Sequence, residues 1–186
     1  MAIESGLVFG CFTGDTKIKI VDKQSLSLFD LHRMYGCHNP DICKYKSSKC
    51  STRCAKIFYV YTLDSFGKVI VGRAHSPRIT QENVNLLEIK IKGLGSYRCS
   101  PNHRHKLSDN TFILAKHLKD GDELLSLRYD QNGLMVNGST SFLVVESVKV
   151  LSDTATVYDF TVEKHANFAL DIGNFVSNST KGVDYE

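Results

Sequence analysis

The sequence of 186 residues predicts a mainly β, single-domain protein with two short helices. Polar and apolar residues alternate with period two along several segments, which is typical of half-buried strands. The clearest of these segments are residues 17–20, 68–71 and 156–162. Sequences typical of hairpins or short loops separate the strands at residues 64–67, 108–110, 132–133 and 137–138. A hydrophobic content of 42% is sufficient for one globular core in a chain of this length.

Two helical segments interrupt the predicted strands. Residues 25–35 contain Ser27 and Asp30 at the spacing of a capping box, and Gly36 follows as a stop signal. A shorter helix is expected at residues 114–119, where Gly121 closes it. The sequence has no internal repeat and no flexible linker, so one domain is expected.

Composition excludes several classes of function. The net charge of +3 comes from 23 basic and 20 acidic residues, which gives no general attraction to nucleic acid or to an anionic membrane. The longest apolar runs, such as residues 57–63, are much shorter than a membrane span. The first ten residues have an early acid and no long apolar core, unlike a signal peptide. We therefore expect a soluble cytoplasmic protein that binds neither membrane nor nucleic acid.

Residues 31–56 form a basic, cysteine-rich segment that does not follow the strand pattern. Six basic residues accompany one acid there, together with two histidines. The four cysteines of the segment are Cys37, Cys43, Cys50 and Cys54. Their spacings lack the C-x2-C pairs of a strong zinc signature. Three interpretations stay open: a structural zinc site, a disulfide pair, or a solvated insertion with incidental thiols. We assign no metal ligands.

Nucleophiles lie at both ends of the predicted domain. Cys11 follows Gly10 immediately before the first alternating strand, and its thiolate can attack a carbonyl carbon. Asn178 ends an apolar segment directly before Ser179. Its side-chain amide can attack its own main-chain carbonyl, which forms a succinimide and cuts the chain before Ser179. These residues therefore indicate self-cleavage chemistry.

Four segments together resemble an intein of the Hint superfamily, in the order that the family shows. They are CFTGDTKIKI from residue 11, GLGSYRCSPNHRHKL from residue 93, ILAKHLKDGDEL from residue 113, and VYDFTVEKHANFALDIGNFVSNS from residue 157. The family's T-x-x-H pattern is present as Ser100-Pro101-Asn102-His103. The resemblance implies a mini-intein without a homing endonuclease domain. It also implies a compact, horseshoe-like β fold that brings both splice junctions together.

The resemblance implies three parts of the chain: an N-terminal flank (1–10), the splicing domain (11–178, with the insertion at about 31–56) and a C-terminal flank (179–186). Cys11 would convert its bond to Gly10 into a thioester, and Ser179 would then take over the acyl group as an ester. Cyclisation of Asn178 would release the splicing domain, after which the flanks would be joined by a peptide bond. This is single-turnover self-processing without a cofactor. Its partners are the flanks in cis and, for a naturally divided intein, a complementary fragment.

Further site residues are implied by the same resemblance. His103 is the expected proton donor to the leaving amine, and Ser100 is expected to hydrogen-bond nearby. A shift of one register would give the role of His103 to His105. Asp159 is expected to relay protons and to orient the nucleophiles. Cys99 is interpreted as a buried structural thiol.

The chain departs from the family pattern at its C-terminal end. Ser177 stands before Asn178, where a histidine is usual. Ala166 occupies another common histidine position, and His165 precedes it by one residue. In a strand this shift would turn the side chain to the opposite face, so His165 can act as the base only if the segment is a loop or a bulge. The serine at position 179 must also be activated locally.

Two other functions are compatible with the sequence. The first is a related autoprocessing domain that cleaves at Cys11 without ligation, although such a domain would not need Asn178 and Ser179. The second is a β-rich zinc-binding interaction module in which residues 37–54 carry the function.

Overall fold

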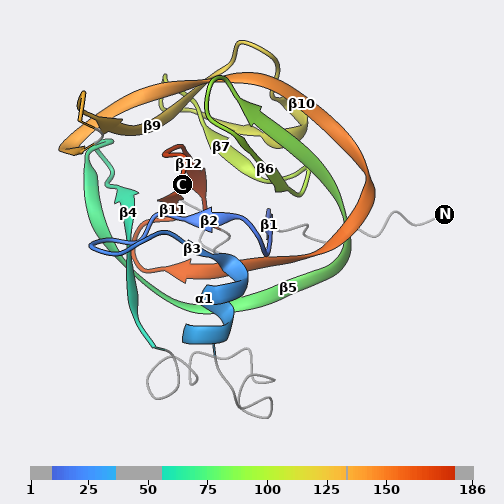
Figure 1. The fold of residues 1–186 in the computed structure, drawn as a ribbon. Helices are drawn as coiled ribbons and strands as arrows, with labels where there is room; N and C mark the ends of the chain where they lie inside the picture. Colours follow the sequence, from blue (N-terminus) through green and yellow to red (C-terminus); the bar gives the residue numbers. More distant parts are fainter. Residues whose placement is uncertain (1–9, 37–55, 133, 179–186) are drawn as a thin grey trace.

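Two long, paired strands form the outer part of the molecule. The computed structural model describes residues 10–36, 56–132 and 134–178. Strand β5 (Val69–Ile91) has 23 residues and β10 (Met135–Val162) has 28, and the two are antiparallel. Figure 1 shows them curving together around the other elements. Five register shifts interrupt their ladder, and such bulges bend and twist a ribbon.

Shorter strands complete three sheets in the described part of the chain. The first sheet has the order β4-β5-β6-β1-β10-β9, the second has the order β11-β12-β7-β8, and β2 pairs with β3. Their bounds are β1 Phe12–Thr13, β2 Lys17–Ile18, β3 Leu26–Ser27, β4 Phe58–Leu63, β6 Ser96–Cys99, β7 Arg104–Lys106, β8 Phe112–Leu114, β9 Glu123–Tyr129, β11 Asn167–Ala169 and β12 Phe175–Ser177. The predicted mainly β class is therefore confirmed.

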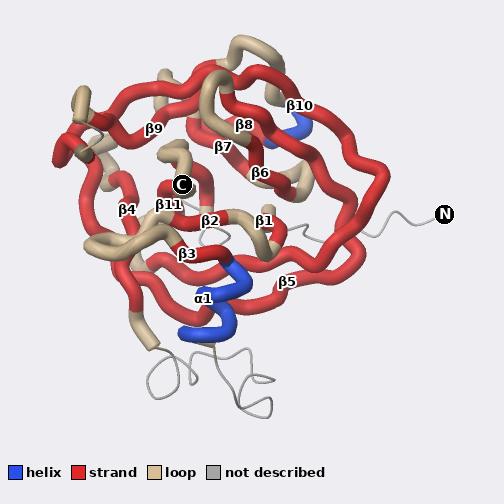
Figure 2. Tube along the Cα trace, viewed as in Figure 1, coloured by secondary structure: helices blue, strands red, loops and turns tan. Residues whose placement is uncertain are grey.

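One α-helix, α1 (Leu28–Tyr35), packs against β5 (Figure 2). Ser27 is its N-cap, because the hydroxyl oxygen of Ser27 accepts a hydrogen bond from the backbone N–H of Asp30 at 3.0 Å. Leu28 and Leu31 bury the inner face of the helix. The cap was predicted correctly, but the helix begins later than residue 25 because residues 26–27 pair as β3 instead.

Two sequence predictions need correction. The second expected helix is a single 3-10 turn, Ala115–His117, because the chain becomes extended at Leu118. The turn expected at residues 137–138 lies inside β10 instead. Gly138 adopts a φ of +74°, and the pairing of β10 with β9 shifts register between Met135 and Thr140. The glycine therefore permits a bulge rather than a chain reversal.

Aromatic side chains fill the space inside the two long strands. Phe12, Phe160 and Phe168 are fully buried, and the rings of Phe160 and Phe168 lie 4.5 Å apart between centroids. Asn167 anchors this region to β4, because its amide oxygen accepts a hydrogen bond from the backbone N–H of Leu63 at 2.7 Å. Among the described residues, no helix has the length and apolar character needed to cross a membrane.

The topology brings the two ends of the predicted splicing domain together. Strand β1, directly after Cys11, lies between β6 and β10. Strand β12, directly before Asn178, pairs with β7 through Val176 and His105. His103 directly precedes β7, and its ring lies against Phe12 of β1. This histidine therefore lies close to both ends.

Candidate active site

Two hydrogen bonds join the main chain of Cys11 to Ser100. The backbone N–H of Cys11 donates to Ser100 Oγ at 3.0 Å, and the backbone N–H of Ser100 donates to the carbonyl of Cys11 at 2.9 Å. The first bond holds the peptide between Gly10 and Cys11, and the second holds the following peptide, between Cys11 and Phe12. Ser100 thus lies directly beside the Gly10–Cys11 peptide bond.

The thiol of Cys11 lies in an apolar cluster with Val84, Leu86 and Val157. Its exposed fraction is 1%. Burial, and secondly the negative charge of Asp159, raise the pKa of this thiol to about 12. The Cys11 thiol is therefore protonated at neutral pH, and an attack by its sulfur would require interactions that favour the thiolate.

His103 is buried beside both ends of the predicted domain. Its ring lies against Phe12, with 4.0 Å between the ring centroids. Burial first, and then the neighbouring His105, hold the pKa of His103 well below its usual value. The main chains of Gly10 and Ser177 favour its protonated form, although neither ring nitrogen forms a hydrogen bond of normal geometry within the described residues. The imidazole is therefore neutral at pH 7 and lies between the two junctions.

His105 is a second buried histidine, and its ring lies next to that of His103. Its ring stacks on Tyr97, with 5.7 Å between centroids, and its centroid lies 5.5 Å from that of His103. Burial lowers the pKa of His105 to about 4. Both of its ring nitrogens are without a hydrogen bond of normal geometry among the residues described. The folded protein therefore resists protonation of this side chain.

The buried histidines should make the fold sensitive to acid. The pKa of His105 falls from 6.5 in the unfolded chain to about 4, so the unfolded state binds more protons between these values. Stability is therefore complete above pH 6.5 and falls as the pH is lowered. At about pH 5 we expect His105 alone to cost about 2 kcal/mol of unfolding free energy. Urea unfolding of an Asn178→Ala protein, which stays uncut, at about pH 7.5 and 5 measures this loss.

A matched pair of variants assigns this acid sensitivity to His105. His105→Phe should lose about 2 kcal/mol less than the parent between the two pH values, because the buried site no longer titrates. His117→Phe makes the same change at an exposed position and should leave the pH dependence unchanged. An equal loss of stability in the parent and in His105→Phe would contradict the assignment.

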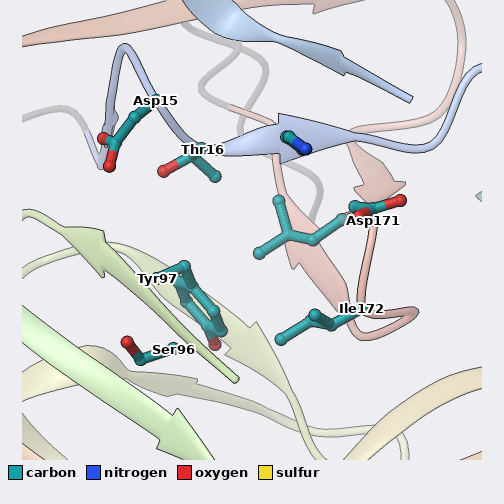
Figure 3. A pocket seen from close by; sticks show the side chains of 8 residues that line it. Asp15, Thr16, Ser96, Tyr97, Asp171 and Ile172 are labelled. Carbon is teal, nitrogen blue, oxygen red and sulfur yellow. The ribbon is translucent and has the colours of Figure 1, made fainter. Parts of the chain in front are cut away.

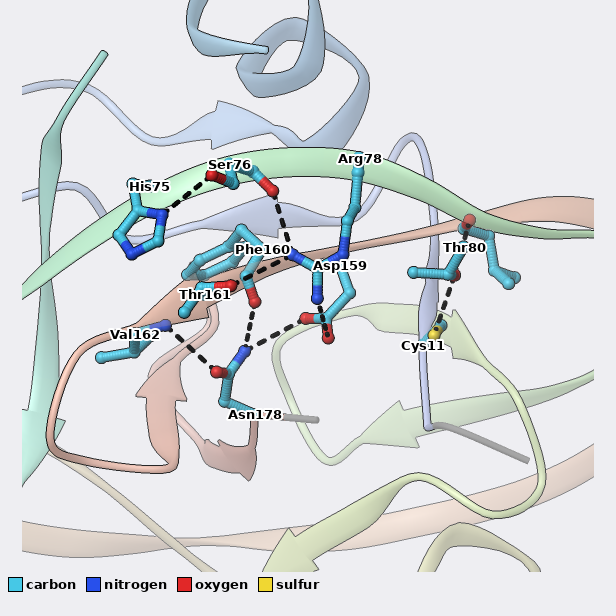
Figure 4. A network of polar contacts seen from close by, with 11 residues as sticks. Cys11, His75, Ser76, Arg78, Thr80, Asp159, Phe160, Thr161, Val162 and Asn178 are labelled. Carbon is cyan, nitrogen blue, oxygen red and sulfur yellow. Dashed lines mark hydrogen bonds and ion pairs between the residues drawn. The ribbon is translucent and has the colours of Figure 1, made fainter. Parts of the chain in front are cut away.

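Asn178 is held by four hydrogen bonds to neighbouring segments, and Figure 4 shows those of its side chain. Its side-chain Nδ2 donates to Asp159 Oδ1 at 3.2 Å and to the carbonyl of Phe160, while its Oδ1 accepts from the backbone N–H of Val162 at 3.1 Å. Its backbone N–H donates to the carbonyl of Ala166 at 2.8 Å. The amide that could cyclise is therefore fully engaged, with one of its N–H groups directed at a carboxylate.

Asp159 is the group that connects the two junctions. It is buried, it accepts the hydrogen bond from Asn178, and its charge acts on the Cys11 thiol. Arg78, opposite Asp159 in the ladder, places Nη2 4.0 Å from Asp159 Oδ2. A buried carboxylate needs such partners, and here they come from β5 and from the C-terminal end.

The remaining predicted residues are placed as follows. His165 lies in the loop between β10 and β11, so the requirement for an irregular backbone is met. Within the described chain, its ring forms no hydrogen bond to Asn178. Ser177 ends β12, with its main chain near His103. Ser179, the flanks at residues 1–9 and 179–186, and the four cysteines of the basic segment lie outside the described residues.

Sequence reasoning missed two side chains of β5 at this site. Thr80 places its Oγ1 3.0 Å from Cys11 Sγ. Arg78, besides approaching Asp159, lowers the pKa of Cys11 by its positive charge. Neither residue belongs to a recognised motif. Only the pairing of β5 with β10 brings them to the junction, and this pairing could not be read from local sequence.

A separate surface pocket of about 220 Å³ lies beside the N-terminal strands and includes Asp15, Tyr97 and Asp171 (Figure 3). None of the eight sequence-predicted site residues lines it. Among the described residues, no group of three or more histidine, cysteine or acidic side chains is arranged to hold a metal ion. The described residues that the sequence predicted for the site thus lie away from this pocket.

The chain has the same fold as several solved inteins, the Hint fold. A variant of the Ssp DnaB mini-intein matches 94% of this chain and 97% of its own, with a TM-score of 0.70 and 16% identity. A DnaX mini-intein from Spirulina platensis matches 91% of this chain and 99% of its own, with a TM-score of 0.62 and 19% identity. A DnaB intein from Synechocystis sp. PCC 6803 gives a TM-score of 0.58, with 16% identity, 92% coverage of this chain and 100% of that one.

Sequence comparison gives a weaker signal than structure. The sequence matches no protein-family model. It is 23% identical over 141 residues to a subunit of the DNA gyrase of Synechocystis sp., a match that covers 73% of this chain and 12% of that protein. The chain therefore corresponds to a small part of this relative. The expected horseshoe-like Hint fold is confirmed by the structural comparisons.

Proposed function

We propose that this chain is a mini-intein that excises residues 11–178 and joins the segments before and after them. The single observation that carries the proposal is the shared environment of the two junctions. Asp159 acts on Cys11 by its charge and accepts a hydrogen bond from Asn178. His103 meanwhile lies beside the main chains of Gly10 and Ser177. A domain that processed one junction alone would not require both arrangements.

The first step exchanges an amide for a thioester. The thiol of Cys11 loses its proton, Sγ bonds to the carbonyl carbon of Gly10, the C–N bond breaks, and the amine nitrogen of Cys11 gains a proton. Ser100 keeps this peptide in place, since its Oγ accepts the N–H of the breaking bond. His103 is neutral at rest, so its role is to transfer to the amine a proton equivalent to that lost by the thiol.

The later steps involve the C-terminal end. Ser179 Oγ attacks the thioester carbon and Cys11 Sγ leaves, which forms a branched ester. Asn178 Nδ2 then loses a proton and attacks its own carbonyl carbon, the bond to Ser179 breaks, the nitrogen of Ser179 gains a proton, and a succinimide remains on the excised domain. Asp159 is placed to accept a proton from Nδ2, because it already accepts its hydrogen bond. The ester between the flanks finally rearranges to a peptide bond.

The hydrogen bonds of Asn178 support an ordered sequence. Both N–H groups of its amide are donated and its oxygen accepts a third bond, so the side chain is restrained before it reacts. Early cyclisation would release the C-terminal flank without joining it. We therefore assign the bonds to Asp159, Phe160 and Val162 a restraining role that ends when the branched ester forms.

The partners of this reaction are the flanking segments in cis. On this proposal the N-terminal flank is residues 1–10 and the C-terminal flank is residues 179–186, with Ser179 as acceptor. His165 and Ser177 are the further candidates to assist Asn178, since they precede it on the adjoining loop and strand. A complementary fragment would be a partner only if the chain is divided in nature.

The proposal is tested by placing the chain between two unrelated folded proteins and following intact masses over time. We expect a joined product of the two outer proteins and a free fragment of residues 11–178. Cleavage without a joined product would favour a cleavage-only autoprocessing domain. Persistence of one uncut mass would contradict both functions, and a zinc stoichiometry measured on that uncut protein would then favour the binding module.

Replacement of Gly10 by valine should slow the N-terminal step strongly. A Cβ at this position would lie 2.5 Å from His103 Cα and 2.8 Å from His103 Nδ1, closer than atoms can pack. The main chain must therefore move away from the histidine, and a displacement of about 1 Å at a reacting centre costs about a hundredfold in rate. The measurement is release of the N-terminal flank by dithiothreitol in an Asn178→Ala background.

The C-terminal junction provides the control for this change. In a Cys11→Ala background, Gly10→Val should leave the rate of cleavage before Ser179 within about twofold, because Asn178 does not contact Gly10. Equal slowing of both junctions would indicate general damage to the fold rather than a local clash.

A further inference from the structure

Thr80 contacts the reacting sulfur from the opposite long strand. Its Oγ1 lies 3.0 Å from Cys11 Sγ and also 3.0 Å from the carbonyl oxygen of Val157. Thr80 belongs to β5, while Val157 belongs to β10 at a point where their ladder changes register. A hydroxyl group has one hydrogen to donate, so it can satisfy one of these two acceptors at a time.

We propose that Thr80 is a further catalytic residue of the N-terminal junction, whose hydroxyl donates to the Cys11 thiolate as it forms and returns to Val157 when the thiol is neutral. The proposal rests on the proposed function and adds a residue to its first step. Thr80 exchanges one acceptor for another and neither gains nor loses a proton. The thiol proton itself is balanced by the proton that His103 transfers to the amine in the first step.

The two acceptors differ in strength in the way that such an exchange requires. A neutral thiol sulfur is a weak acceptor, whereas a carbonyl oxygen is a good one, so the hydroxyl favours Val157 at rest. A thiolate is charged, and hydrogen bonds to charged groups are roughly twice as strong as neutral ones. Thr80 therefore stabilises the charged form selectively, which is the form that attacks the carbonyl carbon.

Charged groups face the same sulfur from both long strands. Asp159 on β10 opposes ionisation of Cys11, and Arg78 on β5 favours it. These two charges also attract each other, with Arg78 Nη2 4.0 Å from Asp159 Oδ2, so their effects on the sulfur partly offset each other. The contribution of Thr80 is a direct contact and does not depend on this balance.

The test compares Thr80→Val with Thr80→Ser, both in an Asn178→Ala protein that keeps the chain intact. Valine retains the branched shape and removes the hydroxyl, whereas serine retains the hydroxyl. Alkylation of Cys11 by iodoacetamide is quantified on the Cys11 peptide by mass spectrometry between about pH 7 and 9. Its rate is divided by that of Cys99, a second fully buried thiol that reports opening of the structure, so that the ratio follows the thiolate fraction of Cys11. Loss of one hydrogen bond to a charged group should raise the pKa of Cys11 by at least about one unit, which slows alkylation about tenfold.

Serine should restore the alkylation rate to within about threefold of the parent. Thr154→Val, the same change at an exposed position of β10, should have no effect. The free energy of unfolding is measured for each variant, so that loss of structure can be excluded as the cause of slower alkylation. The proposal is overturned if Thr80→Val alkylates at the parental rate, or if Thr80→Ser is as slow as Thr80→Val. Alkylation does not require splicing, so this result is separable from a failure of the flanks to be joined.

Discussion

Replacing Cys11 with alanine should abolish both the release of the N-terminal flank and the joining of the flanks. The thiol is the only group of residue 11 that can form the thioester, and the other cysteine of the described chain, Cys99, belongs to a different core cluster. We expect joined product to fall at least about a thousandfold, as for other enzymes that lose their nucleophile. The measurement is the intact-mass time course with the two outer proteins attached.

Cys99 provides the matched control for this variant. It is a second fully buried cysteine, one strand away on β6, and burial raises the pKa of its thiol. Cys99→Ala should lose some stability and still yield joined product. Cleavage before Ser179 should continue in Cys11→Ala at a reduced rate, because cyclisation of Asn178 does not use the thioester but the hydrogen bonds that restrain its side chain are not released. Joined product from Cys11→Ala would refute the assignment of the nucleophile.

Replacing Asn178 with alanine should stop cleavage before Ser179 and leave the thioester intact. Alanine has no amide nitrogen to form the succinimide, so we expect C-terminal release to fall at least about a thousandfold. The N-terminal step uses Cys11, Ser100 and His103, which contact Asn178 through none of its four hydrogen bonds. The two junctions should therefore separate chemically in this variant.

Dithiothreitol provides the positive readout for the same protein. An added thiol should displace Cys11 from the thioester and release the N-terminal flank, while a Cys11→Ala, Asn178→Ala double variant should release nothing. If dithiothreitol released no N-terminal flank from the single variant, the thioester mechanism would be wrong even though splicing had stopped.

The sequence predicted the class of fold well and the length of its main strands poorly. Alternation identified residues 68–71 and 156–162 as strands, since half-buried strands require this pattern. It did not show that they belong to strands of 23 and 28 residues. Ser76 and Asn83 have positive φ angles within β5, and Gly138 has one within β10. Residues of these types usually mark turns, and here they mark bulges because the partner strand continues alongside.

The candidate site was predictable where its residues lie at the ends of the predicted domain or within one short motif. Cys11 and Asn178 are the ends of the predicted splicing domain, and Ser100 and His103 belong to one motif. Thr80 and Arg78 were not predictable, since they reach the site through pairing between distant strands. The protonation state of His103 was also out of reach. Its neutral form is a consequence of its burial and of the nearby ring of His105. Neither the burial nor the closeness of the two rings can be read from the sequence.

The apolar cluster of Val84, Leu86 and Val157 around the Cys11 sulfur has a consequence for the yield of the reaction. A thioester that waits for Ser179 competes with hydrolysis, and each hydrolysed molecule is permanently lost as two unjoined proteins. A sulfur with an exposed fraction of 1% is shielded from bulk water during this wait. Side chains that take no part in bond making would thus set the fidelity of ligation, and smaller residues in this cluster would lower the ratio of joined to broken product without changing the order of events.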